Sequence, residues 1–181
     1  LFIPAAVAVA KRIGKKYTYS LGMLIIAVSC LVIFFLGHVL GIVFVFVMMF
    51  VAGIGLSTTY PIPWAMIPDT VEWGYLQTGE RREGGYYGVW TFVAQLGQGV
   101  ASLLSGAVMK ATGYVANIEQ TPLASLGIRL LLGPIPGIIF AGAALLVAFY
   151  PLEEKRYNQV LARIQDMEAG RVEPGVADLG R

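Results

Sequence analysis

Residues 60–85, YPIPWAMIPDTVEWGYLQTGERREGG, decide how the chain folds. In this stretch an apolar segment is interrupted by Pro61 and Pro63 and then gives way to charged residues. The charged residues are Asp69, Glu72, Glu80, Arg81, Arg82 and Glu83. The segments on both sides are apolar and long enough to cross a bilayer, which takes about 20 residues for a helix. The charged residues therefore lie either in a loop at a membrane surface or between helices that move.

The composition of the chain is that of an integral membrane protein. Only 13% of its 181 residues are charged, and its mean hydropathy is +0.71. Soluble domains carry roughly 25% charged residues. The 22 glycines and nine prolines suit transmembrane helices, in which neighbouring helices satisfy the backbone groups that proline frees. The single cysteine, Cys30, lies in an apolar run, and we interpret it as a small buried hydrophobic residue.

Hydropathy predicts an all-α bundle of four complete membrane spans. The predicted spans are residues 18–37, 42–67, 86–109 and 128–150. An uncharged turn at 37–41 separates the first two, and Pro151 ends the last. Residues 1–10 are apolar but too short to cross a bilayer, so we interpret them as the end of a preceding helix of a longer protein. The predicted membrane bundle therefore covers residues 1–151.

Residues 152–181 form a polar tail. Its apolar residues recur at helical spacing: Tyr157, Val160, Leu161, Ile164 and Met167. This pattern predicts a short amphipathic helix that lies along the membrane surface or against the loops. We expect the residues after Gly170 to be disordered.

Lysine and arginine are distributed unevenly between the two sides of the predicted bundle. All but two of the 13, Lys110 and Arg129, fall on the side that holds the charged stretch and the tail. Loops rich in lysine and arginine stay in the cytoplasm. We therefore predict a multi-pass protein of the plasma membrane, the inner membrane of a bacterium, with a cytoplasmic C-terminus.

Two carboxylates and two guanidinium groups in the charged stretch are candidates for a gate. Asp69 and Glu72 are three residues apart, so on a helix both carboxylates point the same way. Arg81 and Arg82 follow a turn at Thr78 and Gly79, so they can fold back onto these acids. One interpretation is a solvated loop with surface ion pairs, each worth about 0–1 kcal/mol. The other is a cytoplasmic gate, with Glu83 included, whose ion pairs form when the path is shut and break when it opens.

Four residues place polar groups on the third predicted span at helical spacing: Trp90, Thr91, Gln95 and Gln98. Uncharged polar side chains inside a membrane either link helices or line a water-filled cavity. In a cavity, an indole beside amides suits a sugar, whose ring face stacks while its hydroxyls form hydrogen bonds. Tyr60 and Trp64 on the broken second span would then face the same cavity.

The remaining residues support neither catalysis nor a resident metal or cofactor. No His, Cys and Asp cluster has metal-ligand spacing, and no serine has a base nearby in sequence. The one histidine, His38, lies in the predicted turn on the opposite side. No nucleotide-binding glycine motif competes with this interpretation, so neither an enzyme nor a nucleic-acid partner is predicted.

The chain resembles the glycoside–pentoside–hexuronide:cation symporters, the melibiose permease branch of the major facilitator superfamily. The motifs that carry this resemblance are PWAMIPDTVEWG at 63–74, TGERREG at 78–84, F-x-x-Q-L-G at 92–97, TGYV at 112–115, GIRLLLGPIP at 127–136 and FYPLEEKR at 149–156. The resemblance implies the carboxy-terminal part of a twelve-helix transporter, with helices nine to twelve and the end of helix eight. It also implies that an amino-terminal six-helix bundle is the partner of this part.

The resemblance assigns roles to individual residues. Asp69, Glu72 and Arg81 match charged positions that pair across the two halves at the cytoplasmic gate. Tyr60 matches an aromatic residue near the sugar site.

Thr91 and Gln95 match cavity positions on the eleventh helix. Many relatives have a lysine at the position of Gln95, so a charged link to the cation site is missing here. The coupling ion therefore stays open between Na⁺ and H⁺, with its site expected in the amino-terminal half.

The predicted function is symport of a sugar, glycoside or hexuronide with Na⁺ or H⁺ by alternating access between two bundles. One alternative is a lipid or lysolipid carrier of the same family. Another is a truncated membrane remnant that does not transport and is held together by helix packing among membrane lipids.

Overall fold

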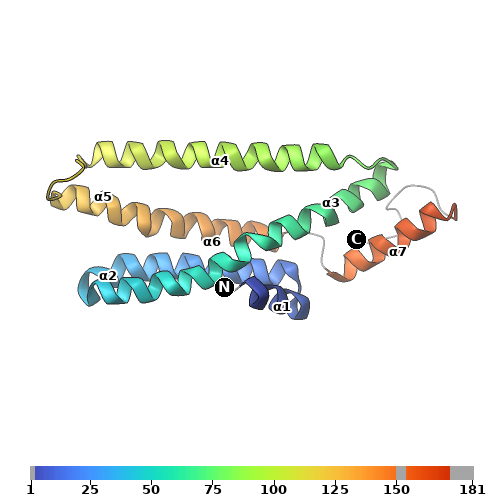
Figure 1. Ribbon diagram of the computed structural model, residues 1–181, viewed down its shortest axis with the longest axis horizontal. Helices are drawn as coiled ribbons and strands as arrows, with labels where there is room; N and C mark the ends of the chain where they lie inside the picture. Colours follow the sequence, from blue (N-terminus) through green and yellow to red (C-terminus); the bar gives the residue numbers. More distant parts are fainter. Residues whose placement is uncertain (1–2, 150–153, 172–181) are drawn as a thin grey trace.

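The computed structural model describes residues 3–149 and 154–171. These residues form helices and no β-strand, so the predicted all-α class is confirmed. The helices are α1 (Ile3–Ile13), α2 (Lys15–Thr59), α3 (Pro61–Thr78), α4 (Glu83–Ala111), α5 (Pro122–Leu132), α6 (Pro134–Ala148) and α7 (Glu154–Glu168) (Figure 1).

Helix α2 is a hairpin of two helical arms. Gly41 has φ +79° and ψ −175°, a conformation that glycine adopts without steric cost, and the chain reverses there (Figure 1). The arms approach closely because Gly22 faces Gly55 and Thr58, and any Cβ on Gly22 would collide with the Thr58 hydroxyl. The reversal lies at the end of the turn that the sequence predicts at 37–41.

Helix α3 follows the second arm of α2 after a break at Tyr60. Pro61 starts the helix, where its fixed φ is favourable and its missing N–H is not needed. The helix continues to Thr78 and ends at Gly79, which has φ +72°. The apolar stretch 42–67 is therefore divided at Tyr60, and the acids that follow it lie on a helix rather than in a loop.

Three helical stretches are long and apolar enough to cross a membrane. They are Lys15–Thr78, Glu83–Ala111 and Pro122–Ala148. The first contains the reversal at Gly41, so it supplies two arms. Within the last, Gly133 breaks the helix with φ −115° and ψ −95°, and Pro134 starts α6. The chain is therefore a multi-pass membrane protein.

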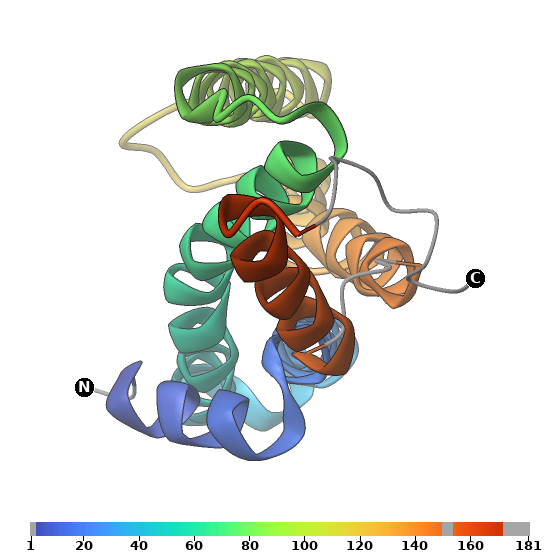
Figure 2. The same ribbon diagram turned by 90° about the vertical axis from the view of Figure 1, so that its right-hand side faces the viewer.

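The bundle is held together mainly by α2 and α6. Gly137 packs against Ala27 and Leu31 of the first arm of α2, because the absence of a side chain lets the two backbones come close. Helix α4 differs, since none of its residues is buried. It contacts α3 and α5 and otherwise stands apart from the other helices (Figures 1 and 2).

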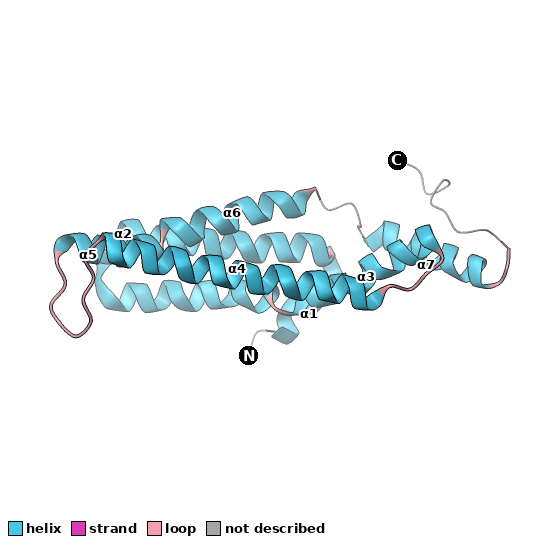
Figure 3. Ribbon diagram, turned by 90° about the horizontal axis from the view of Figure 1, so that it is seen from above, coloured by secondary structure: helices cyan, strands magenta, loops and turns pink. Residues whose placement is uncertain are grey.

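The two ends of the bundle carry different segments. Figure 1 shows the reversal of α2 and the loop 112–121 at one end, and α7 with the loop 79–82 at the other. Helix α7 packs on α3, where Val160 and Ile164 bury their side chains against Leu76 (Figure 3). The tail helix thus lies against the protein. We predict disorder after Gly170, but Arg171 is described and pairs with Asp166 at 2.9 Å. Residues 172–181 lie outside the described residues.

Candidate functional site

Asp69 is held by an ion pair with Lys15 at the start of α2. The Nζ atom of Lys15 lies 2.6 Å from Oδ2 and 2.9 Å from Oδ1 of Asp69. The same ammonium donates to the carbonyl of Ala65 at 3.0 Å. Asp69 is only 7% exposed, and a buried carboxylate is costly unless it is paired and hydrogen-bonded. The sequence analysis uses Lys15 only as part of the lysine and arginine distribution, and it does not predict this contact.

Tyr157 of α7 covers this ion pair. The Nζ atom of Lys15 lies 5.3 Å from the centroid of its ring, within reach of a cation–π interaction. The pKa of the Tyr157 phenol is raised above its ordinary value by burial, by a hydrogen bond to Glu72 and by the negative charges of Asp69 and Glu72. The phenol therefore stays neutral and donates to the carboxylate. Tyr157 ties the tail helix to both acids of the predicted gate.

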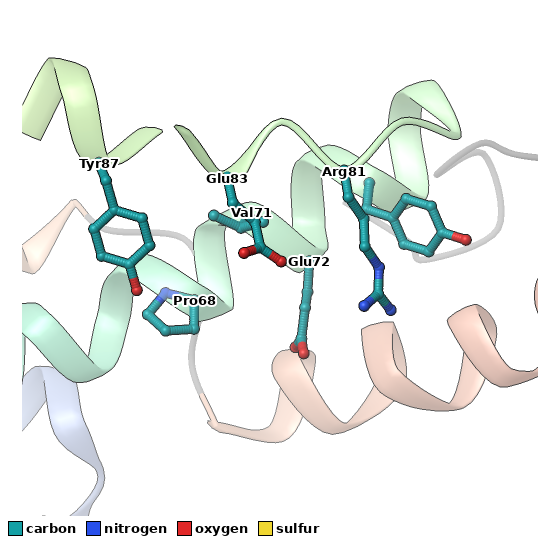
Figure 4. A pocket seen from close by; sticks show the side chains of 7 residues that line it. Pro68, Val71, Glu72, Arg81, Glu83 and Tyr87 are labelled. Atoms are coloured by element: carbon teal, nitrogen blue, oxygen red, sulfur yellow. The ribbon is translucent and has the colours of Figure 1, made fainter. Parts of the chain in front are cut away.

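A pocket of about 180 Å³ opens along α3 at this end of the bundle. It is lined by Pro68, Val71, Glu72, Tyr75, Arg81, Glu83 and Tyr87 (Figure 4). The structure thus brings three of the predicted gate residues, Glu72, Arg81 and Glu83, to one pocket. The Oε2 atom of Glu72 is buried and has no hydrogen-bond partner among the described residues. Glu83 lies in the first turn of α4, where an acid is favourable to the helix dipole.

In this structure Arg81 and Arg82 form ion pairs with acids other than Asp69 and Glu72. Arg81 pairs with Glu168 of α7 at 3.2 Å and lies over the Tyr75 ring, 4.8 Å from its centroid. Arg82 pairs with Glu80 at 2.6 Å. Because α3 stays helical to Thr78, residues 69–78 advance about 13 Å along its axis, which separates Arg81 from Asp69. Asp69, meanwhile, already has Lys15 as its partner.

An aromatic cluster lies between α3 and α4, away from the charged residues. The ring of Trp64 is 6.2 Å from that of Tyr87 with 25° between their planes, and 6.3 Å from that of Trp90 with 73°. These are stacked and edge-to-face arrangements, which aromatic pairs prefer. Trp64 is still 49% exposed, and Tyr60, at the break between α2 and α3, is 74% exposed.

The polar residues of α4 lie on the surface of that helix. Tyr87, Thr91 and Gln95 follow at four-residue spacing, so they share one face. The hydroxyl of Thr91 donates to the carbonyl of Tyr87 at 2.8 Å, and Gln95 and Gln98 are exposed. In the described part of the chain, the side chains of Thr91, Gln95 and Gln98 form no hydrogen bond to another helix. Their role as cavity residues stays a prediction.

A second, apolar pocket of about 330 Å³ lies where α2, α3 and α4 meet. Its lining residues are Tyr19, Pro63, Met66, Ile67, Thr70, Tyr86, Val89, Trp90 and Val93. Trp90 therefore contributes both to this pocket and to the aromatic cluster. Across residues 3–149 and 154–171, no group of three His, Cys, Asp or Glu side chains is placed to hold a metal ion. The coupling-ion site stays a prediction.

Comparison with known proteins gives one family match and several relatives. Residues 1–154 match the family described as MFS/sugar transport protein. The chain is 33% identical over 164 residues to the "Glucuronide carrier protein homolog" of Escherichia coli K12, covering 91% of this chain and 35% of that protein. It is 35% identical over 166 residues to the "Putative sulfoquinovose importer" of Salmonella typhimurium LT2, covering 91% and 34%.

A third relative, the "Uncharacterized symporter YjmB" of Bacillus subtilis 168, is 34% identical over 169 residues, which are 92% of this chain and 35% of that protein. The chain spans about a third of the length of these relatives, and no solved structure matches it. The resemblance to the glycoside–pentoside–hexuronide symporters is confirmed by these matches. The chain belongs to the MFS/sugar transport protein family.

Proposed function

We propose that this chain forms part of a secondary transporter that carries a sugar or sugar acid across the membrane by alternating access. The observation that carries the proposal is the placement of two different surfaces on the α3–α4 pair. A group of aromatic and amide side chains, with Trp64 half exposed, Trp90 partly buried and Gln95 exposed, lies beside a layer of charged residues at one end of the bundle. A substrate wall next to an ionic gate is what alternating access requires.

The substrate class follows from the chemistry of this wall and from the relatives. Between Glu83 and Lys110, α4 has no charged residue, so its exposed face offers amides, hydroxyls and aromatic rings. These groups suit the hydroxyls and ring faces of a sugar. The relatives in Escherichia coli and Salmonella are named for glucuronide and sulfoquinovose, which are both anionic sugars. If the substrate is anionic, its counter-charge comes from outside this wall.

We further propose the gate and its orientation. Glu72, Arg81 and Glu83 form a cytoplasmic gate that Lys15 and Tyr157 support through Asp69 and Glu72. The distribution of lysine and arginine supports a cytoplasmic C-terminus in the plasma membrane. The coupling ion, Na⁺ or H⁺, would bind in the amino-terminal half that the resemblance implies. No residue of this chain is assigned a catalytic role.

The test is uptake by the protein expressed from its complete reading frame and reconstituted in vesicles. A panel of labelled neutral sugars, hexuronides and sulfonated sugars is offered with an Na⁺ gradient, a proton gradient or neither. We expect one class to accumulate and accumulation to collapse when one gradient is removed. Absence of accumulation with folded protein would overturn the proposal. Uptake of a labelled lysolipid in the same vesicles would support the lipid carrier instead, for which the apolar pocket beside Trp90 is the obvious site.

A further inference from the structure

Tyr87 is the residue that the aromatic cluster and the charged pocket have in common. We infer that Tyr87 is a positioning residue that transmits the occupancy of the substrate wall to the cytoplasmic gate. This inference rests on the proposed function. It concerns a residue that neither the sequence patterns nor the resemblance singles out.

On the substrate side, Tyr87 contacts the ring that a sugar would use. Its ring is stacked on Trp64 at 6.2 Å between centroids, while Trp90 meets Trp64 edge-on at 6.3 Å. Trp64 is thus held from two directions but keeps about half of its surface exposed. A ligand that stacks on the exposed part of Trp64 would press on a ring whose orientation Tyr87 fixes.

On the gate side, Tyr87 forms one end of the charged pocket. Figure 4 shows its phenol beside Pro68, with Glu83 and Glu72 between Tyr87 and Arg81, which lies at the other end. Glu83 lies one turn before Tyr87 on α4, so the two side chains move with the same helical turn. A shift of Tyr87 therefore displaces an acid of the gate.

The backbone of α3 is weakest where Tyr87 bridges the two helices. Pro68 lies inside α3 and has no N–H, so the carbonyl of Trp64, four residues earlier, loses its helical hydrogen bond. Helices bend at such positions. The stack of Tyr87 on Trp64 joins α4 to the segment before Pro68, whereas Glu72 lies after it. A bend at Pro68 would change the distance between Glu72 and Glu83, and Tyr87 is placed to set that bend.

The test separates substrate binding from transport in the complete protein. The variants are Tyr87→Ala, Tyr87→Leu, which keeps bulk without stacking, and Tyr87→Phe, which keeps the stack. We expect Tyr87→Ala and Tyr87→Leu to lower the maximal uptake rate about tenfold. This factor corresponds to the interaction energy of one aromatic pair, which both variants remove. The Kd for the transported sugar should change less than about threefold. Tyr87→Phe should transport at the wild-type rate. Phe46→Ala, which removes an exposed aromatic residue of α2 that lines neither pocket, is the matched control.

A second readout reports the gate directly. In a protein whose Cys30 is replaced by alanine, Glu83→Cys is labelled with a membrane-impermeant thiol reagent with and without sugar. We expect sugar to change the labelling rate, and Tyr87→Ala to abolish that change. The inference is overturned if Tyr87→Ala transports normally, if its Kd rises in proportion to its loss of rate, or if sugar still changes the labelling. Failure of the wild-type protein to transport any sugar would instead overturn the proposed function.

Discussion

Helices α2 and α4 are both apolar enough to cross a membrane, but their surroundings are opposite. The first arm of α2 packs against its own second arm and against α6, with Gly22 and Gly137 at the close approaches. Helix α4 buries none of its residues, and a Cβ on Gly97 or Gly99 would meet nothing within 4 Å. Being apolar enough to cross a membrane therefore does not by itself place a helix in the core of this bundle. The closely packed helices also have small residues opposite a neighbouring backbone, which α4 lacks within this chain.

The largest effect is expected from filling the close approach inside α2. Gly22→Val would force a branched side chain into Thr58 and the backbone of Gly55, so the two arms would have to separate. Overpacking of this kind costs about 1–3 kcal/mol or more. We expect the complete protein to reach the membrane poorly and its melting temperature in detergent to fall.

Gly97→Val is the matched variant on α4, because it has no neighbour in this chain to displace. We expect Gly97→Val to leave the melting temperature closer to the wild-type value than Gly22→Val does. Equal losses for the two variants would contradict the contrast, because α4 would then be packed as closely in the complete protein as α2.

The second effect concerns the ion pair that joins α2 to α3. Lys15→Ala leaves the Asp69 carboxylate 7% exposed and without its cation, which is strongly unfavourable for a buried charge. Since 40% of the Lys15 side chain is exposed, water relieves part of the penalty, and we expect a loss of about 1–3 kcal/mol in the free energy of unfolding. Chemical unfolding of the single variants Lys15→Ala and Asp69→Asn and of the double variant checks this. If the double variant is no more stable than Lys15→Ala, the unpaired charge of Asp69 is not the cause of the destabilisation.

A smaller effect is expected at the tail helix. Tyr157→Phe removes the hydrogen bond to Glu72 and should cost about 0.5–1.5 kcal/mol. The pKa of Tyr157 is raised on folding. The stabilisation that this tyrosine gives relative to phenylalanine is therefore complete below pH 10, the ordinary tyrosine pKa. It is lost at higher pH, where the unfolded chain releases the proton and the folded chain keeps it. Melting temperatures of both proteins between pH 7 and 11 test the sign, and a difference that grows with pH would contradict it.

The sequence predicts the fold class and the family of this chain because both can be recognised from patterns that do not depend on how the helices pack. Hydropathy identifies the membrane segments, and the motif around Asp69 identifies the relatives. The partners of the charged residues are not predictable in the same way. Whether Arg81 reaches Asp69 depends on α3 remaining helical through Pro68 up to Gly79, which overrides the usual preference of proline for a helix start.

Long-range contacts are missed for a related reason. Lys15 and Asp69 are separated by 54 positions, and the helical hairpin of α2 brings them together. Tyr157 reaches both Asp69 and Glu72 only because α7 packs on α3. An amphipathic pattern predicts that the tail helix has an apolar face but not which surface this face covers. Tyr87 has no sequence signal, because its importance lies in having Trp64 on one side and the charged pocket on the other.

The smallest effect is expected where the sequence shows the densest charge. Arg82 and Glu80 form a close pair at 2.6 Å, but both side chains are about two-thirds exposed, at 69% and 65%. Exposed pairs contribute about 0–1 kcal/mol because solvent screens them and ordering two long side chains costs entropy. We expect Arg82→Gln to leave both stability and uptake near wild-type values. Lys15→Ala also removes one positive charge from this end of the bundle, but we expect it to lower stability. Uptake and unfolding of the two variants, measured in parallel, show whether burial or local charge density determines the effect of removing a charge. A loss in Arg82→Gln as large as that in Lys15→Ala would mean that Arg82 has a partner in the other half of the transporter and belongs to the gate after all.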